Sequence, residues 1–400
     1  MNQYKTITLK LNNKYNEQLI SLSKECGKIY SKTISYIHKI HKKKNIWLSA
    51  TQMQKIIKSD KLHSQTVQAI IQKYFAALYS CFKNKKTNPK AKPPIRTHKY
   101  YCIPFKKSAI KIKNNIIYLS CGKNNDIISI PIPKNKLLAN VKYMEIVWND
   151  GYYLKIIVDI NKNVAPLIAN DTAHIVAVDP GEIHPLTIFD GKKSTIYNGR
   201  YLRSLKRYRE KVKATFSSKI DKKQKKSKRK FKLTQSKQKK VKKINNKIKD
   251  AEHKITKHFV ETCKNNNVST VVYGDTTHIR QHIDYGKKNN QKLHQWAFSR
   301  IKFQVKYKLE NECIKFISMD EKYTSSTCPK CHKNIKPNGR NFKCSCGFKA
   351  HRDVVGAINI YSKYQGKIPV VADMTPATGI RFYNNLSYKS NICVTHKVVV

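Results

Sequence analysis

The sequence predicts an α/β protein, with an N-terminal β-barrel that carries a helical insertion and a second α/β domain that holds an inserted zinc ribbon. Three observations lead to this prediction. The chain has 400 residues, more than one compact domain usually contains. Apolar runs of strand length alternate with helical periodicity in its second half. Four cysteines then follow at the spacing of metal ligands.

The N-terminal part, residues 1–165, begins with alternating apolar residues from Tyr4 to Leu11, which predict a strand. Apolar residues then recur at helical spacing from Asn16 to about Lys83, without proline, and predict two pairs of helices in an insertion of about residues 13–90. A basic, proline-broken loop follows at 84–99. Further strands, which complete a barrel or sheet, are predicted near 110–112, 116–119, 127–130, 144–148 and 152–160.

The second part starts with an apolar strand, Ile175–Asp179, which ends on an acid. Segments 184–189 and 194–197 predict the next two strands of a meander. Residues 201–250 contain 22 lysines and arginines against three acids, and helical spacing on both sides of the densest run, Lys222–Lys230, predicts a basic helical hairpin over about 201–262. We interpret the hairpin as a phosphate-contacting arm; the alternatives are a solvated helix face or a localisation signal.

Another buried strand, at 268–275, ends in Asp275. A helix is expected at 296–313, a strand at 314–319, and a further helix directly after the cysteines, beginning near Asp353. The C-terminal tail, 366–400, shows no periodicity that assigns an element.

The cysteine segment, 328–349, reads Cys328-Pro-Lys-Cys331 and then Cys344-Ser-Cys346. Four thiolates complete tetrahedral zinc without a water ligand, so a structural Zn²⁺ is predicted. The second pair is one residue shorter than the usual spacing, which leaves His332 or His351 as alternatives to Cys346 for the fourth ligand. The other seven cysteines are scattered, which favours a reducing, intracellular compartment.

The acids are few, with 24 Asp and Glu against 81 Lys and Arg, yet Asp179 and Asp275 both end apolar strands and Asp353 opens a late helix. A buried carboxylate needs hydrogen bonds, a counter-charge or a metal. Acids in this order are typical of RNase H-like folds. Converging carboxylates can hold Mg²⁺ for phosphodiester cleavage, whereas a single strand-end Asp is more often a turn or helix cap.

The net charge of +57 destabilises a compact fold unless a polyanion offsets it, so nucleic acid is the expected partner. The N-terminus lacks the apolar core of a signal peptide and no long apolar run follows, so no membrane association is expected.

Three stretches resemble a known family: Asp179-Pro-Gly, the segment 323–331 up to the first cysteine pair, and Cys346-Gly-Phe-Lys-Ala-His351-Arg-Asp353 with the following Val-Val-Gly-Ala-Ile-Asn-Ile. They are similar to the transposon-encoded TnpB proteins. His-Arg-Asp followed by Gly-Ala resembles the eukaryotic and viral branch, the Fanzor proteins. The match covers about residues 171–362; the N-terminal half agrees only in order and character, as a wedge-like barrel with recognition helices.

The resemblance implies an RNA-guided DNA endonuclease with a RuvC domain of RNase H-like fold, here residues 171–327 and 350–365. Asp179 matches the first RuvC aspartate and Asp353 the last. The middle acid departs from the TnpB pattern: Glu321 stands where a relocated glutamate falls, and Asp275 stands at the usual strand end. The implied partners are a guide RNA and double-stranded target DNA, with a monomer or dimer on the RNA.

The alternatives are a catalytically inactive RNA-guided DNA-binding protein and a transposase that performs strand transfer, because one fold supports several chemistries. The expected location depends on the source: nucleus or viral factory in a eukaryote or virus, otherwise the cytoplasm.

Overall fold

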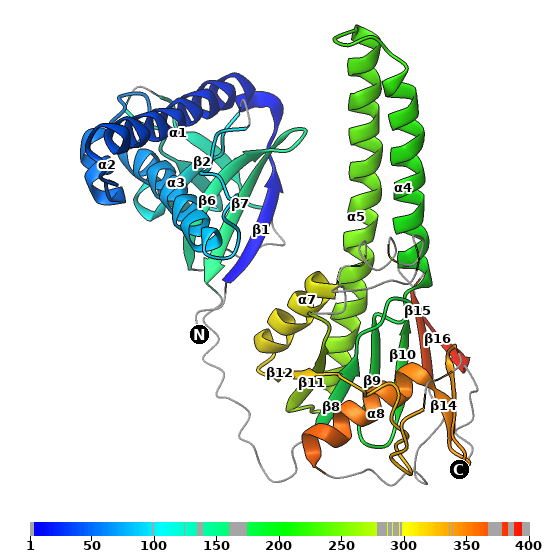
Figure 1. Cartoon of the computed structure of the whole chain (residues 1–400). Helices are drawn as coiled ribbons and strands as arrows, with labels where there is room; N and C mark the ends of the chain where they lie inside the picture. Colours follow the sequence, from blue (N-terminus) through cyan, green and yellow to red (C-terminus); the bar gives the residue numbers. More distant parts are fainter. Residues whose placement is uncertain are drawn as a thin grey trace. The chain divides into compact units, whose positions relative to one another are not determined.

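The chain forms two compact units, Met1–Asn163 and Val164–Val400, in this computed structural model. Figure 1 shows the elements of both units. The boundary predicted between the two domains, between residues 165 and 171, lies outside the described residues. Those residues are 4–97, 100–123, 125–133, 138, 140–159, 174–277, 286, 290, 296, 298–335, 337, 339–366, 378–382 and 388–393.

The N-terminal unit combines two antiparallel sheets with three helices. One sheet has the strand order β1-β7-β6-β2 and the other β3-β4-β5. Strand β1 pairs along its full length with β7, the last strand of the unit, so the helices between β1 and β2 are an insertion into one sheet. The strands are β1 (Tyr4–Lys10), β2 (Ile103–Lys106), β3 (Ile110–Lys113), β4 (Ile116–Leu119), β5 (Ile128–Pro131), β6 (Val141–Trp148) and β7 (Tyr152–Asp159).

The predicted helix pairs were wrong in number: each apolar set lies on one long helix. These helices are α1 (Asn16–Lys44) and α3 (Ser64–Lys85), with the short α2 (Ala50–Ile56) between them. The apolar spacing of α1 continues without a break until Asn45, whose left-handed backbone (φ 51°) ends the helix. Helix α2 is fixed at its start by a capping box of Ser49 and Gln52.

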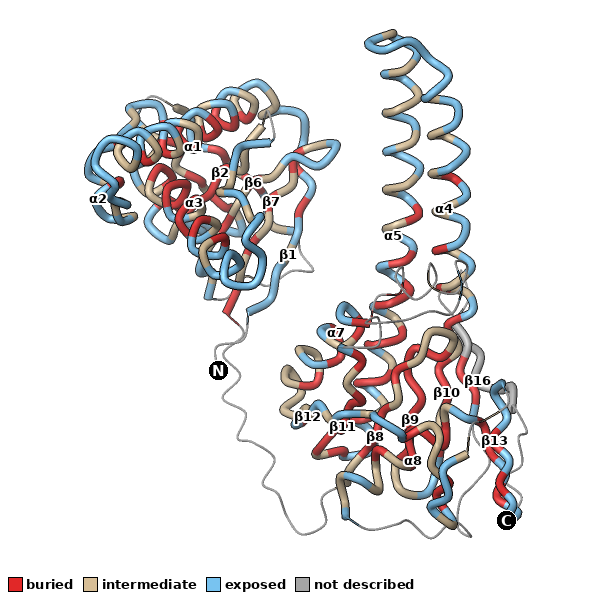
Figure 2. Tube along the Cα trace, viewed as in Figure 1, coloured by how far each residue is buried: buried red, intermediate tan, exposed pale blue. Residues whose placement is uncertain are grey.

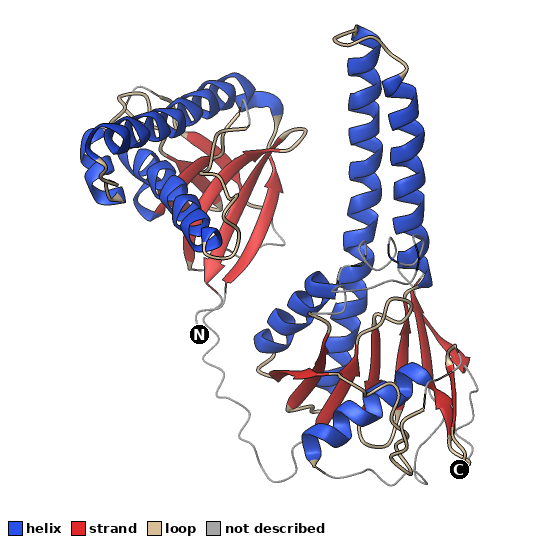
Figure 3. Ribbon diagram, viewed as in Figure 1, coloured by secondary structure: helices blue, strands red, loops and turns tan. Residues whose placement is uncertain are grey.

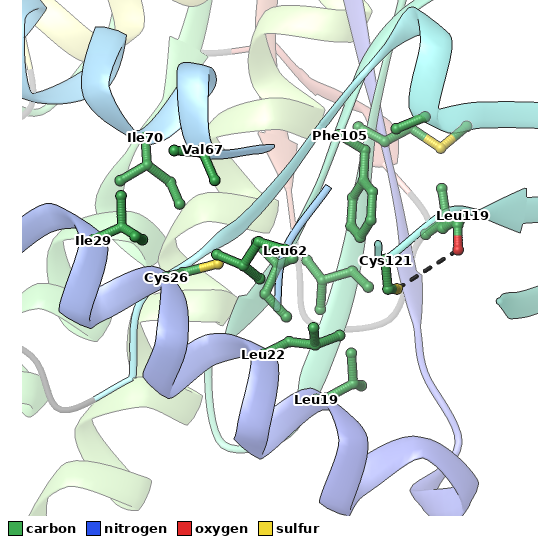
Figure 4. Close-up of a cluster of buried hydrophobic side chains, with 14 of the residues drawn as sticks. Leu19, Leu22, Cys26, Ile29, Leu62, Val67, Ile70, Phe105, Leu119 and Cys121 are labelled. Carbon is green, nitrogen blue, oxygen red and sulfur yellow. Dashed lines mark hydrogen bonds between the residues drawn. The ribbon is translucent and has the colours of Figure 1, made fainter. Parts of the chain in front are cut away.

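The core of this unit joins the helices to the sheets. Leu19, Leu22 and Cys26 of α1 meet Val67 and Ile70 of α3 above Phe105 of β2, as Figure 4 shows. All of these side chains are buried. Burying each stabilises the fold by about 1.5–3 kcal/mol, so the helical insertion is an integral part of this unit.

The C-terminal unit is built on a seven-stranded sheet of order β12-β11-β8-β9-β10-β15-β16. Strands β8, β11 and β12 are parallel neighbours, whereas β9 runs antiparallel to both β8 and β10. These strands are β8 (Ile175–Asp179), β9 (Leu186–Phe189), β10 (Ser194–Asn198), β11 (Thr270–Asp275), β12 (Lys315–Asp320), β15 (Thr378–Phe382) and β16 (Tyr388–Cys393).

Helices cover both faces of this sheet, as the ribbon in Figure 3 shows. Val176 and Val178 of β8 pack toward α5 (Lys228–Asn265) and α7 (Phe298–Asn311). Ala177 packs with Ile360 on the opposite face, beneath α8 (Arg352–Gln365). A strand buried on both faces reads as an uninterrupted apolar run, which is the pattern of β8 in the sequence.

The tail, for which the sequence predicted no element, contributes two strands to the sheet. Strand β15 runs parallel to β10, and β16 pairs antiparallel with β15. Short strands at the edge of a sheet have weak apolar alternation, since they are stabilised by pairing with a neighbour already in place.

Candidate active site and metal centre

The carboxyl ends of the three parallel strands bring four acids to one edge of the sheet. Asp179 is the last residue of β8 and Asp275 the last of β11. Asp320, the last of β12, is in register with Asp275, and Glu321 follows it. This edge is the place where ligands bind in open α/β sheets.

Asp179 lies at the centre, against helix α8. A Cβ atom added at Gly356 of α8 would come within 2.5 Å of the Asp179 Oδ2, so the absence of a side chain there lets the helix approach the carboxylate. Burial raises the pKa of Asp179 well above its usual value, and the carboxylates of Asp353 and Glu321 raise it further. The three acids are therefore close enough to repel one another.

Glu321 points back toward the same edge. A Cβ at Gly274 of β11 would lie 2.6 Å from the Glu321 Oε2 and 3.1 Å from Pro180, the residue after Asp179. That buried oxygen has no hydrogen-bond partner among the described residues. Burial, followed by the charges of Asp275 and Asp320, raises the pKa of Glu321 to about 7. A buried, unpartnered carboxylate oxygen is the group that a cation would satisfy.

Asp353 sits in the first turn of α8 and is held by His184 and Arg340. His184 Nδ1 lies 2.7 Å from Asp353 Oδ2, and Arg340 Nη1 lies 3.3 Å from the same oxygen. The ring of His351, which caps the helix, accepts a hydrogen bond from the Asp353 N–H at 3.2 Å. Burial opposes ionisation of Asp353, but His184, His351 and Arg340 outweigh it and lower its pKa.

Asp275 has a different environment. Its Oδ1 accepts hydrogen bonds from the backbone N–H and the hydroxyl of Thr277, and Lys302 Nζ lies 2.9 Å from the same oxygen. Partial burial acts against ionisation, but these contacts lower the pKa of Asp275 to about 2. These hydrogen bonds are typical of a residue that ends a strand. The charge of Asp275 nevertheless contributes to the raised pKa of Glu321.

Sequence reasoning did not find His184 or Arg340. Gly181 N donates to the His184 carbonyl at 2.9 Å, so the Pro-Gly turn after Asp179 folds the chain back and brings the imidazole to Asp353. The available signal was a histidine inside an apolar meander. Asn359 was also missed: its amide donates to the carbonyls of Thr324 and Thr327 at 2.6 and 2.7 Å and fixes the segment after Glu321 to α8.

The four predicted zinc ligands converge at one point. The Sγ atoms of Cys328 and Cys346 are 3.6 Å apart, and those of Cys331 and Cys344 are 3.3 Å apart. Sulfurs bound to one tetrahedral zinc are about 3.8 Å apart, so this cluster can hold such an ion with little movement. Of the two alternative ligands, His332 is exposed and outside the cluster. His351 lies instead with His184 and Asp353.

The ribbon is attached directly to α8. Its hairpin consists of β13 (Asn341–Lys343) and β14 (Lys349–His351), and β14 leads without a gap into the helix. Phe342 and Phe348 pack with Val355 of α8 in one buried cluster. Arg340, just before β13, contacts the carboxylate of Asp353. The position of this carboxylate is thus tied to the ribbon.

The chain is similar to known proteins along most of this unit. Residues 160–280 match the OrfB_IS605 family, described as a probable transposase, and residues 298–360 match the Cas12f1-like TNB domain. The TnpB-like protein MJ0751 of Methanocaldococcus jannaschii is 32% identical over 216 residues, which are 52% of this chain and 75% of that protein.

Two further proteins are similar to this chain, one over a shorter stretch of sequence and one in fold. The CRISPR-associated endodeoxyribonuclease Cas12f1 of Sulfoacidibacillus thermotolerans is 32% identical over 113 residues, covering 27% of this chain and 25% of that protein. The solved Cas12f1–sgRNA–target DNA complex contains a chain that aligns with a TM-score of 0.62 at 15% identity, over 86% of this chain and 82% of that one.

The layered sheet with an inserted ribbon and carboxylates at its strand ends defines an RNase H-like protein of the RuvC type. The match to MJ0751, at 32% identity over 75% of that protein, identifies the family. The chain belongs to the TnpB family. The predicted fold class and family are confirmed. Among the described residues, no helix is long and apolar enough to cross a membrane.

Proposed function

We propose that this protein is an RNA-guided DNA endonuclease that hydrolyses phosphodiester bonds with Asp179, Glu321 and Asp353. The observation that carries the proposal is that the buried Asp179 ends the central strand β8 and feels the charges of both Asp353 and Glu321. Buried like charges of this kind destabilise a site unless a cation is shared between them. The endodeoxyribonuclease among the relatives supports the same activity.

The three carboxylates fit Mg²⁺, which prefers oxygen ligands and which, when bound, activates water and stabilises the leaving oxygen. Asp179 is central, because Asp353 and Glu321 both act on it. His184 and Arg340 hold the Asp353 carboxylate ionised and oriented. Lys302 forms an ion pair with Asp275 and so lies at the same edge of the sheet, where its ammonium group would attract a phosphate.

We assign the middle acid to Glu321 and not to Asp275. Glu321 has an unpartnered oxygen in the described structure and a raised pKa, whereas Asp275 is satisfied by Thr277 and Lys302. A functional comparison separates the two. Glu321→Gln should abolish cleavage, and Asp275→Asn should retain most of it.

The four cysteines are proposed to bind structural Zn²⁺. All four ligands come from the protein, so the ion would supply stability and no chemistry. Its contribution to the active site would be positional, through Arg340 and α8.

A guide RNA and a double-stranded DNA target are the proposed partners. The charge of +57 supports polyanion binding, and the similar solved structure is a complex with sgRNA and target DNA. The sequence around His351 and Asp353 supports a place on the Fanzor-like branch of the family.

The test is cleavage of a plasmid library with randomised sequence beside one target, by the protein purified with its own RNA in Mg²⁺. We expect cutting next to a preferred flanking sequence, and none with Asp179→Ala. If wild type and Asp179→Ala both leave every plasmid intact while still binding RNA, the protein is an inactive RNA-guided binder. Joined products in the same reaction would indicate strand transfer instead.

A further inference from the structure

The helical hairpin of the C-terminal unit has a distal part that contains no fully buried residue. We call residues 213–243 the distal arm; it includes the end of α4 (Arg200–Asp221) and the start of α5. The last buried residue of α4 is Val212, and the first of α5 is Ile244. Figure 2 shows the two helices projecting as a largely exposed pair beyond that level.

The charged residues of the distal arm are almost all basic. It contains 15 lysines and arginines against a single acid, Asp221. Contacts such as Lys237 Nζ to Ser217 Oγ at 2.6 Å join the helices, but a hydroxyl does not neutralise a lysine. Like charges concentrated on a narrow hairpin repel one another, so the arm gains stability when a polyanion binds it.

The tip of the arm adds an aromatic ring to the charge. Phe231 is 64% exposed, so its ring is open to a partner. A hollow of about 520 Å³ lies around it, lined among others by Lys226, Lys228, Lys230 and Lys232. An exposed ring among lysines combines base stacking with phosphate contact, which is the composition of single-strand binding sites.

We propose that the tip of the distal arm binds unpaired nucleotides of an RNA, with a base stacked on Phe231 and the flanking phosphates on the four lysines. Duplex DNA keeps its bases stacked inside the helix, whereas the loops and ends of an RNA present free base faces. The inference rests on the proposed RNA partner, and it names the element that holds an unpaired segment of it.

The first test removes the arm. Arg209 contacts Asn245 and Ser217 contacts Lys237, so residues at the level of 213 and 241 face each other across the hairpin. Residues 218–236 can therefore be replaced by a short glycine-rich turn, which removes no buried side chain and keeps Phe216, a partly buried ring that packs against the core. The probe is a labelled RNA stem-loop, with binding followed by fluorescence anisotropy over a range of salt in zinc-containing, magnesium-free buffer.

We expect the arm-deleted protein to bind the stem-loop at least tenfold more weakly at physiological salt. The slope of log K against log salt should also fall by about 0.7 for each phosphate that the protein no longer binds. Unchanged thermal unfolding of the truncated protein is the control for folding. Because no cleavage occurs without Mg²⁺, this result does not depend on nuclease activity.

The second test is the point variant Phe231→Ala, with Phe303→Ala of α7 as the matched control. Phe303 is 65% exposed and outside the arm. Loss of one stacked base should weaken stem-loop binding about 5- to 100-fold, while the salt slope and the affinity for the same stem without a loop stay unchanged. Phe303→Ala should bind like the wild type.

Equal RNA affinities with and without the arm would overturn the proposal, and so would identical effects of Phe231→Ala and Phe303→Ala on RNA binding. It would also be overturned if removal of the arm weakened the binding of duplex DNA alone, because the arm would then be a DNA contact. If instead the arm binds the loop but no variant or wild type cleaves DNA, the nuclease function fails while this inference stands.

Discussion

His184 Nδ1 lies 2.7 Å from the Oδ2 of Asp353, across 169 residues of sequence. Both side chains are well buried, and this contact is the first among those that lower the pKa of Asp353. In the proposed nuclease, the imidazole would therefore act through the carboxylate, as a positioning residue. Groups of this kind beside metal-binding carboxylates set their orientation and basicity.

Replacing His184 by alanine is expected to reduce DNA cleavage about 10- to 100-fold, because Asp353 loses its main hydrogen bond. The pKa of Asp353 should rise, so the acid side of the pH–rate profile should move to higher pH. His184→Gln, which keeps an N–H donor, should recover part of the rate. His174→Ala, which removes a histidine bonded to the Asn266 carbonyl, is the control. A rate loss without any change in the pH profile would contradict the positioning role.

Gly356→Ala is expected to remove activity while leaving the protein folded. The new methyl group would lie 2.5 Å from Asp179 Oδ2, so the carboxylate or the helix must move. A displacement of about 1 Å in a metal-binding group costs roughly 100-fold in rate. Alanine is otherwise the better helix former, so reduced helix propensity is not a competing cause. The measurement is cleavage rate together with thermal unfolding, with Ser362→Ala on the same helix as control.

Glu321 should make the metal-free protein less stable as the pH rises. Its folded pKa is about 7 against a usual 4.5, so the folded state binds the extra proton between these values. The unfolding free energy should therefore fall by about 3 kcal/mol from pH 4.5 to 7, and then level off. Urea unfolding without Mg²⁺ measures this. The fall should be clearly smaller in Glu321→Gln, and the remainder comes from Asp179, whose pKa is also raised.

Asp275→Asn provides the opposite case. The pKa of Asp275 is lowered to about 2, so its stabilising contribution is complete above pH 4 and is lost only as the pH falls toward 2. Because the charge of Asp275 helps to raise the pKa of Glu321, Asp275→Asn should reduce the fall between pH 4.5 and 7, but by less than Glu321→Gln does. If Asp275→Asn, and not Glu321→Gln, removed the fall, the assignment of the middle acid would be reversed.

The sequence supports the sheet and its acids well, because strands buried on both faces have a distinctive apolar run and Asp179 and Asp275 end two of them. The choice between Asp275 and Glu321 as the middle acid could be made only from the structure. It depends on the space that Gly274 leaves for one carboxylate and on the contact of Lys302 with the other. His184 was missed because a turn, and not periodicity, brings it to Asp353.

The base of the helical hairpin contains a buried ion cluster that offers a stability test. Lys206 Nζ lies 3.8 Å from the centroid of the Trp296 ring and 3.7 Å from Glu252 Oε1. Arg300 donates two hydrogen bonds to the same carboxylate, at 2.5 and 2.6 Å. Burial lowers the pKa of Lys206 to about 8 in spite of Glu252. The carboxylate is therefore the group that makes a buried lysine tolerable.

Glu252→Gln should lower the unfolding free energy by about 3–5 kcal/mol at pH 7, because it leaves the Lys206 cation buried without its counter-charge. Glu252 raises the pKa of Lys206, so in the variant the buried amine loses its proton below the wild-type pKa of about 8. The loss of stability should therefore shrink as the pH rises toward 8, where the amine becomes neutral in both folded proteins. The double variant Glu252→Gln with Lys206→Met should recover much of the stability at pH 7. Glu312→Gln, which breaks a more exposed ion pair with Lys264, should cost much less. Equal costs for Glu252→Gln and Glu312→Gln would show that the buried cluster does not hold the base of the hairpin.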